Sequence, residues 1–128
     1  MFQSGEMRFT RDHEWVRVDG DAMVMGITVY AAQQLGDIVF VELPDTGRTF
    51  EAEGELCVVE SVKAASEVYA PISGKVVGQN TALRDEPTIV NDDPEGAGWM
   101  VKFEAADPNE LNKLLTREQY DELLQGIS

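Results

Sequence analysis

One lysine occupies the centre of the most informative segment of this 128-residue chain. Apolar, strand-forming residues lead into it through residues 58–60, and a second strand pattern leaves through residues 68–69. The pattern turns at residues 62–64, so Lys63 is predicted to lie at a hairpin tip with its amine exposed. Taken by itself, an exposed hairpin lysine is usually an ordinary solvated charge.

Other residues that could do chemistry are few. His13 is the only histidine, and His13-Glu14 lacks the second histidine of a zinc-protease helix, so we expect no metal site. Residues 92–95 are acidic but lack the alternating oxygen ligands of a calcium loop. A glycine-rich phosphate loop and a Gly-x-Ser-x-Gly elbow are both missing. Cys57, the single cysteine, cannot form an internal disulfide and is predicted to pack as a small hydrophobe on its strand.

The composition restricts the partners. With 10 basic and 24 acidic residues the net charge is −14, which disfavours nucleic acid and anionic membranes. The acidic surface either suits docking onto basic protein patches or simply keeps the protein soluble. No run is long and apolar enough to span a membrane. No signal peptide or transit peptide is visible, which favours the bacterial cytoplasm, or the mitochondrial matrix only if a transit peptide has been removed.

The chain is predicted to be mainly β with short helices. Residues 14–18 and 22–25 flank the turn pair Asp19-Gly20, which is typical of a hairpin. Thr28 is then placed to begin a short helix that ends at Gly36. Further strands are predicted over residues 37–43, 55–61, 68–70, 75–77 and 99–104. Short strands between Gly and Pro turns indicate a flattened barrel or sandwich, a hybrid of the two.

The C-terminal part changes to helical periodicity. Asp107-Pro108 and Glu110 are typical of a capped helix start, and Thr116 with Gln119 repeats the capping-box pattern. We therefore expect helices over about residues 108–125, packed on the domain's own core. Residues 1–6 are predicted to be a loose tail, and residues 7–128 to form one domain.

Several motifs in order resemble one known family. Glu-Ser-Val-Lys-Ala at residues 60–64, followed by Ala-Pro-Ile-Ser-Gly at residues 70–74, is similar to the lipoyl-attachment hairpin of the glycine cleavage H-protein family. His-Glu-Trp at residues 13–15, the run at residues 36–44 and Gly-Trp-Met at residues 98–100 recur in the family's order. The resemblance covers nearly the whole chain and implies a fold of the lipoyl-domain type.

The resemblance also implies a function. Lipoate would be attached covalently to Lys63 by a lipoate ligase or a lipoyl/octanoyl transferase. The chain would act as a non-catalytic, monomeric shuttle that accepts an aminomethyl group from a pyridoxal-phosphate glycine decarboxylase. It would present that group to an aminomethyltransferase, and dihydrolipoamide dehydrogenase would reoxidise the arm. The family docks its loaded arm in a surface cleft, and the resemblance assigns that role to Glu14 and, less firmly, to Asp12 and Glu67. Glu60 is a candidate for recognition by the modifying enzyme.

Two departures and three alternatives accompany this interpretation. The family usually has His where this chain has Tyr30, and some members have His at Gln34, so a role for imidazoles in the cleft is in doubt. A relay that hands lipoyl groups to other proteins would have a similar sequence. A biotinyl module would favour Met on both sides of the lysine, where Val62 and Ala64 stand. An independent enzyme using His13 and Glu14 would lack an organised nucleophile or metal.

Overall fold

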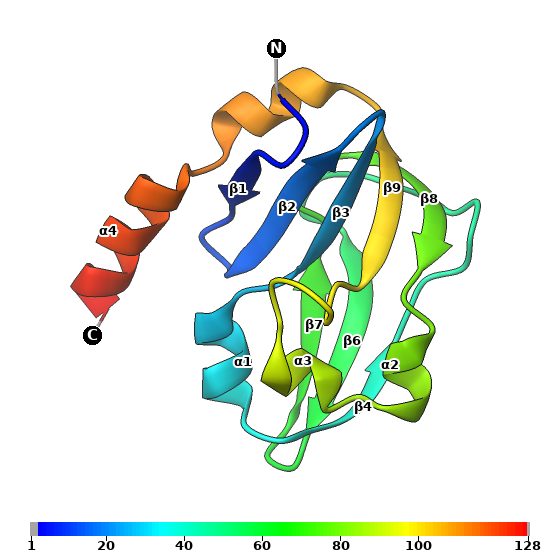
Figure 1. Ribbon diagram of the computed structural model, residues 1–128, viewed down its shortest axis with the longest axis vertical. Helices are drawn as coiled ribbons and strands as arrows, with labels where there is room; N and C mark the ends of the chain where they lie inside the picture. The colour runs from blue at the N-terminus through cyan, green and yellow to red at the C-terminus, as the bar shows by residue number, and fades with distance from the viewer. Residues whose placement is uncertain (1–2, 128) are drawn as a thin grey trace.

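The computed structural model describes residues 3–127, which form two β-sheets, short helices at one end and a longer helix along one side (Figure 1). The larger sheet is antiparallel, with the order β1-β2-β3-β9-β8-β5. Its strands are β1 (Met7–Phe9), β2 (Glu14–Asp19), β3 (Ala22–Ile27), β5 (Thr49–Phe50), β8 (Gly74–Gln79) and β9 (Val101–Ala105). The first predicted hairpin is confirmed, because β2 and β3 pair up to the turn at Gly20.

The smaller sheet contains the lysine hairpin. Its strands β4 (Ile38–Glu42), β6 (Glu55–Ser61) and β7 (Ala65–Tyr69) pair in the order β4-β6-β7. Val41, Val59 and Val68 turn inward from the three strands and are buried. Within residues 3–127 no ladder joins the two sheets, so the mainly β prediction is confirmed and its barrel component is corrected to a sandwich-like pair of sheets. A barrel requires every edge to be paired, and β4 and β7 remain edges.

Short helices cover the end of the sandwich near β4 (Figure 1). α1 (Val29–Leu35) begins as predicted, since the Thr28 side chain accepts a hydrogen bond from the Ala31 N–H. It ends at Gly36, whose φ of 79° is easily adopted only by a residue without a Cβ. α2 (Ala82–Asp85) and α3 (Ile89–Asp92) were not expected, because four residues are too few to show a helical period.

The C-terminal helices differ from each other in type. η1 (Pro108–Lys113) is a 3₁₀ helix capped by Asp107, and Glu110 accepts a hydrogen bond from the Ser73 N–H. α4 (Arg117–Ile127) starts with the predicted capping box: Gln119 Oε1 accepts from the Thr116 N–H at 3.0 Å, and Thr116 Oγ1 accepts from the Gln119 N–H at 3.2 Å. The sequence thus indicated both helical starts.

Two hydrophobic clusters hold the fold together. The larger one lies between the sheets and includes Cys57, whose predicted packing as a buried hydrophobe is confirmed. The second joins α4 to the outside of the larger sheet through Phe9, Trp15, Val24 and Tyr120. The rings of Phe9 and Tyr120 stack with centroids 4.9 Å apart, so α4 is fixed beside β1.

The N-terminal segment is attached to the larger sheet over part of its length. The Gly5 N–H donates to the Val18 carbonyl, and the Val18 N–H donates to the Glu6 carbonyl. These bonds correct the predicted loose tail at residues 5 and 6, because they extend the pairing beyond β1. Residues 1 and 2 of that prediction lie outside the described residues. In the described part of the chain, none of the helices has both the length and the apolar character needed to cross a membrane.

Candidate functional site

The tip of the β6–β7 hairpin is a short turn held by one serine. The Ser61 N–H donates to the Ala64 carbonyl at 2.9 Å, which leaves Val62 and Lys63 as the two tip residues. The Ser61 hydroxyl oxygen accepts from the N–H groups of Lys63 and Ala64 at 3.1 and 3.3 Å. Tight hairpins usually need left-handed backbone at the turn, and neither tip residue has a positive φ. The Ser61 side chain therefore stabilises this turn in place of a favourable backbone geometry.

A second set of contacts fixes where the tip lies. The Val62 N–H donates to the Asp37 carbonyl at 3.0 Å, so the tip is tied to the segment that follows α1. Asn91 of α3 holds the same segment, because its amide donates to the Gly36 carbonyl and accepts from the Ile38 N–H. The hairpin is thus anchored at its tip as well as at its base.

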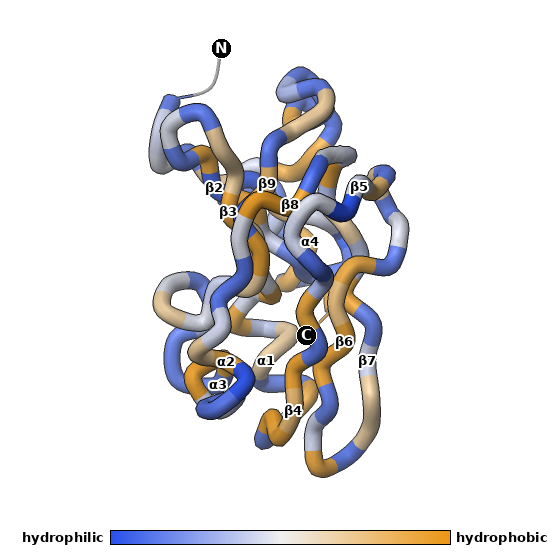
Figure 2. Tube along the Cα trace, turned by 90° about the vertical axis from the view of Figure 1, so that its right-hand side faces the viewer, coloured by the Kyte–Doolittle hydropathy of each residue, from blue (hydrophilic) through white to orange (hydrophobic). Residues whose placement is uncertain are grey.

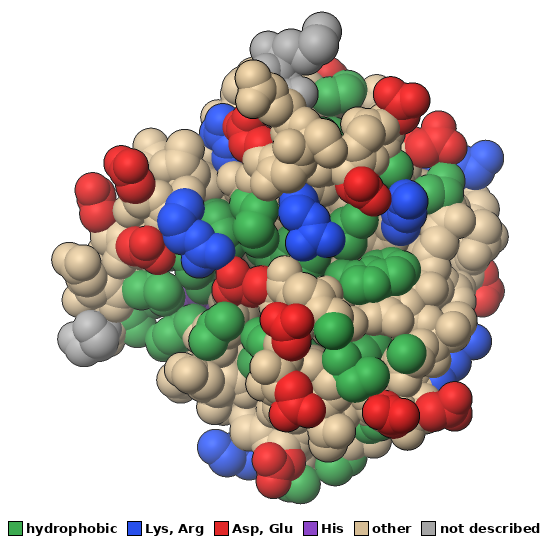
Figure 3. All heavy atoms as spheres, in the orientation of Figure 1, with side chains coloured by type: hydrophobic (Ala, Val, Ile, Leu, Met, Phe, Trp, Pro, Cys, Tyr) green, Lys and Arg blue, Asp and Glu red, His purple; other side chains and the backbone are tan. Residues whose placement is uncertain are grey.

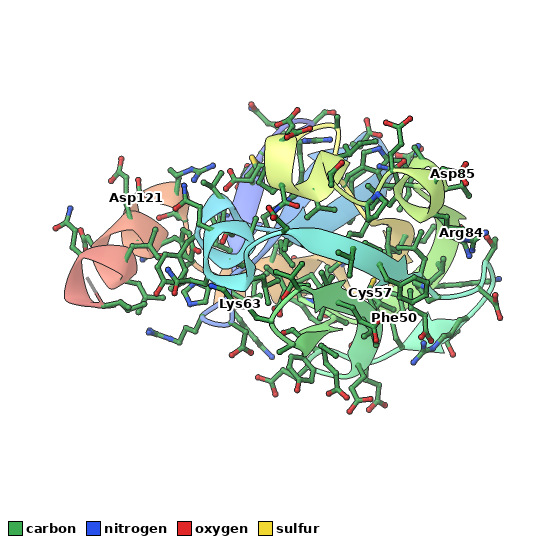
Figure 4. All side chains as sticks on the ribbon, turned by 90° about the horizontal axis from the view of Figure 1, so that it is seen from below. Phe50, Cys57, Lys63, Arg84, Asp85 and Asp121 are labelled. Carbon is green, nitrogen blue, oxygen red and sulfur yellow. The ribbon has the colours of Figure 1, made fainter. Side chains whose placement is uncertain are left out.

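Lys63 is exposed at this anchored tip, as predicted. It forms no ion pair with another residue of the range 3–127. Figure 4 views the molecule from below Figure 1 and shows Lys63 far from Cys57. The Cys57 thiol is buried, and burial raises its pKa to about 12, so it is not a competing nucleophile at neutral pH. The exposed amine is open to acylation by another protein.

A cleft lies at the other end of the hairpin. Its volume is about 290 Å³, and Tyr69, Ala70 and Pro71 bring the end of β7 to its wall. The turn between β1 and β2 forms the opposite side, and apolar side chains of Phe9, Leu114 and Leu115 form part of the wall. The cavity therefore combines apolar side chains with acidic residues and with two basic residues, Arg11 and Lys113.

Glu14 is the buried acid of this cleft, with only 3% of its surface exposed. Its carboxylate accepts hydrogen bonds from the Thr10 hydroxyl at 2.6 Å and from the Tyr69 N–H at 3.3 Å. Burial raises its pKa to about 7, against the opposing effect of those two hydrogen bonds. No cation within residues 3–127 pairs with it. A buried carboxyl without a positive partner is suited to receive a cation from outside the chain.

The other predicted acids are divided between two places. Asp12 is exposed and lines the same cleft as Glu14. Glu67 lies on the outer surface of β7, where its carboxylate accepts from the Tyr69 hydroxyl at 3.2 Å, and it does not line that cleft. Glu60 is exposed on β6 near the lysine tip. Tyr69 connects the cleft to the outer surface of β7, since its N–H donates to Glu14 and its hydroxyl donates to Glu67.

Behind the cleft lies a polar group that the sequence did not indicate. The Tyr120 hydroxyl, buried on α4, lies 2.8 Å from His13 Nδ1 and 2.7 Å from Thr28 Oγ1. His13 has a left-handed φ of 70° and directly precedes Glu14. The centroid of the Tyr30 ring lies 4.6 Å from that of the His13 ring. Gln34 is exposed on α1. The signal for Tyr120 was hidden, because its place in an apolar helical stripe indicated only core packing.

Comparisons with known proteins agree over nearly the whole chain. A family model described as Glycine cleavage H-protein matches residues 7–127. A glycine cleavage system H protein of Xanthobacter autotrophicus is 53% identical over 122 residues, which are 95% of this chain and 98% of that protein. One of Phenylobacterium zucineum is 56% identical over 115 residues, 90% and 95% of the two chains. The crystal structure of a glycine cleavage system H protein from Mycobacterium marinum superposes with a TM-score of 0.86 at 36% identity, covering 96% of this chain and 99% of that one.

Proposed function

The chain belongs to the glycine cleavage H-protein family, and from that premise we propose that Lys63 is the residue to which lipoate is attached. The family role is that of a non-catalytic lipoyl-carrier shuttle in the glycine cleavage system, and the chain has that role. The observation that carries the assignment to Lys63 is its exposed position at the anchored tip of the β6–β7 hairpin. Once attached, the lipoyl group supplies a dithiolane for redox and group-transfer chemistry.

The residues around Lys63 fit such a group. The amine is exposed and free of ion pairs to the residues of the described range, so no ion pair has to break before acylation. The Ser61 turn holds the backbone of Lys63 in place.

The assignment of Lys63 is tested by substitution. Lys63→Arg keeps the positive charge and should abolish lipoylation, as measured by intact mass after incubation with lipoate–protein ligase, lipoate and ATP. Lys75→Arg, an exposed lysine on β8, should be modified like the wild type; lipoate mapped to Lys75 or Lys113 would reject the assignment.

Glu14 is proposed to hold the cargo in the cleft. The carried aminomethyl group has an amine that is cationic near neutral pH, and it decomposes in water when it is not protected. The buried Glu14 carboxylate favours a cation through a charge-assisted hydrogen bond of about 1.5–3 kcal/mol. Thr10 and Tyr69 orient the carboxylate through the hydrogen bonds that it accepts. The burial of Glu14 lowers the local dielectric and so strengthens the pairing.

The proposal for Glu14 is tested by the stability of loaded protein. Glu14→Gln should still be lipoylated and loaded, but it should release ammonia faster than the wild type when no aminomethyltransferase is present. Glu53→Gln is the matched control, because Glu53 lines the same cleft but is exposed. Equal rates of ammonia release in wild type and Glu14→Gln would remove Glu14 from the mechanism. Asp12, which is exposed and lines the cleft, is proposed as a weaker contributor, and Asp12→Asn should have a smaller effect. Glu67 is also proposed for arm docking, but it lies outside this cleft, and Glu67→Gln should have the smallest effect.

Glu60 is proposed to assist recognition by the enzyme that modifies Lys63. It is exposed on the strand that leads into the tip, three residues before the lysine. Glu60→Ala should slow lipoylation without lowering the unfolding midpoint. Glu42→Ala, an exposed acid on β4 farther from the tip, is the control. Identical lipoylation kinetics for Glu60→Ala and wild type would contradict this role.

The remaining assignments follow from the family. The partners are those of the glycine cleavage system. We assign to them the pyridoxal-phosphate glycine decarboxylase, the aminomethyltransferase, dihydrolipoamide dehydrogenase and the lipoylating enzyme. The bacterial origin of the relatives supports a cytoplasmic location, which cell fractionation would test. Co-purification of the decarboxylase activity with this protein would test the first partner.

A further inference from the structure

An exposed apolar strip lies beside the lysine tip and takes no part in the cleft. Val39 and Phe40 on β4 are 54% and 47% exposed, and Val62 at the tip is 66% exposed. Figure 2 shows the hydrophobic β4 segment next to the end of the β6–β7 hairpin. The hydrogen bond from the Val62 N–H to the Asp37 carbonyl places the tip two residues from the start of this strip. A contiguous group of exposed apolar side chains is typical of a surface that another molecule covers.

A β-bulge is the reason that Phe40 points outward. On β4, Ile38 pairs with Ser61 and Phe40 pairs with Glu60, so one extra residue, Val39, is inserted between these pairs. In regular alternation Ile38 and Phe40 would both face the core. The bulge instead leaves Ile38 buried and turns both Val39 and Phe40 to the surface. The bulge in the backbone of β4 therefore exposes two adjacent apolar side chains, Val39 and Phe40, on the same surface.

Acidic side chains surround this strip. Asp37 just before β4, Glu42 on β4 and Glu60 on the facing strand β6 are exposed. Figure 3 shows that acidic side chains also predominate on the face that it displays, in keeping with the net charge of −14. A partner that covers the strip must therefore present an apolar pocket bordered by basic residues.

We propose that Val39, Phe40 and Val62 form the docking surface for the enzyme that acylates Lys63. This inference rests on the proposed function of Lys63 as the attachment site. An acylating enzyme has to bring the amine itself to its bound acyl group, so it must cover the hairpin tip and what lies beside it. The enzymes of glycine cleavage act on the far end of the attached arm and can dock elsewhere. The strip is contiguous with the amine, which identifies the acylating enzyme as its occupant.

The chemistry at that docked site is an acyl transfer without oxidation or reduction. With a ligase, the amine of Lys63 attacks the carbonyl carbon of lipoyl adenylate. A C–N bond forms, the bond from that carbon to the phosphate oxygen of AMP breaks, and AMP leaves. The ammonium group of Lys63 loses two protons in the process, one before the attack and one on forming the amide. The strip takes no part in these bond changes and acts only on binding.

The test compares two pairs of variants as substrates of lipoate–protein ligase. Phe40→Ala should raise the KM for the apo-protein about 5- to 10-fold, the factor expected when the exposed half of a phenylalanine side chain is buried on binding. Its kcat should be nearly unchanged, and Phe40→Leu should recover most of the affinity. Val39→Ala should have a smaller effect in the same direction. Val77→Ala is the control for Val39→Ala, because it removes the same atoms from an exposed strand residue of the larger sheet. It should change the KM by less than about 2-fold.

The outcomes separate this inference from the proposed function. Loss of acylation in Lys63→Arg together with a wild-type KM in Phe40→Ala would overturn the docking surface and leave the attachment site intact. Acylation of Lys63→Arg would instead overturn the attachment site. Phe40→Ala protein that is already lipoylated should react normally with glycine decarboxylase. A raised KM for decarboxylase with an unchanged KM for ligase would assign the strip to the other partner and overturn the inference.

Discussion

At the tip of the β6–β7 hairpin, a cation is exposed and forms no ion pair among the described residues, whereas at the base an acid is buried among its hydrogen-bond partners. The side chain of Lys63 is open to solvent, and Ser61 fixes its N–H. Glu14 is 3% exposed and is bonded by Thr10 and Tyr69. A group that another enzyme must reach requires access, while a group that must hold a cation gains strength where water is excluded. The tip of the hairpin thus exposes a charged side chain, and the cleft at its base buries one.

The largest expected difference between the two ends is in the pH dependence of stability. Burial raises the pKa of Glu14 to about 7 from its ordinary value of 4.5. The folded state therefore binds this proton more tightly, and the stabilisation that is present below pH 4.5 is lost as the pH rises through about 7. Wild type should lose up to about 3 kcal/mol of unfolding free energy relative to Glu14→Gln over that range. Urea unfolding at pH 5 and pH 8 measures it.

The control for this experiment is the exposed acid Glu53 in the same cleft. Glu53→Gln should follow the wild-type pH profile closely. Parallel profiles for wild type and Glu14→Gln would mean that the carboxyl of Glu14 is not desolvated in solution, and the contrast between tip and base would disappear.

A smaller effect is expected from the polar group behind the cleft. Tyr120→Phe removes the hydroxyl that lies between His13 and Thr28, and this should lower the unfolding free energy by roughly 1–2 kcal/mol. The loss should also loosen the turn before Glu14 and speed ammonia release from loaded protein. Tyr30→Phe is the matched control, because the Tyr30 hydroxyl makes no hydrogen bond to another residue of the described range. Equal stabilities of the two variants would argue against the role of the Tyr120 hydroxyl.

At the tip, Ser61→Ala should cost roughly 0.5–1.5 kcal/mol, because the N–H groups of Lys63 and Ala64 lose their acceptor. The less ordered turn should also slow lipoylation of Lys63. Ser66→Ala on β7 provides the comparison, since it alters a serine of the same hairpin away from the turn. Urea unfolding and the intact-mass lipoylation assay check both effects, and an unchanged lipoylation rate would show that the turn is preorganised without Ser61.

The smallest expected effect is that of the functional lysine on stability. Lys63→Gln should change the unfolding free energy by less than about 0.5 kcal/mol, because the side chain is exposed and unpaired among the described residues. A larger loss, measured by urea unfolding beside Glu14→Gln, would mean that the lysine packs against the tip. The packing of its stem close to Gly36 makes that a meaningful check.

Local patterns in the sequence determined much of the fold. Alternating strands, the caps at Thr28 and Thr116, and the hairpin around Lys63 were predictable because they depend on residues close in sequence. The burial of Cys57 was predictable for the same reason. The two-residue strand β5 and the four-residue helices were not, because they are too short to show a period.

Only the tertiary structure decided how the site is assembled. The sequence by itself placed Lys63 at a tip and, through family resemblance, assigned Glu14 to a cleft. It did not show that Tyr69, 55 residues away, donates to Glu14, nor that Tyr120, 107 residues from His13, supports the preceding turn. The outward turn of Phe40 also depends on one inserted residue relative to a partner strand. Hydrogen-bond partners, desolvation and register are properties of segments that meet only after folding, so no local pattern determines them.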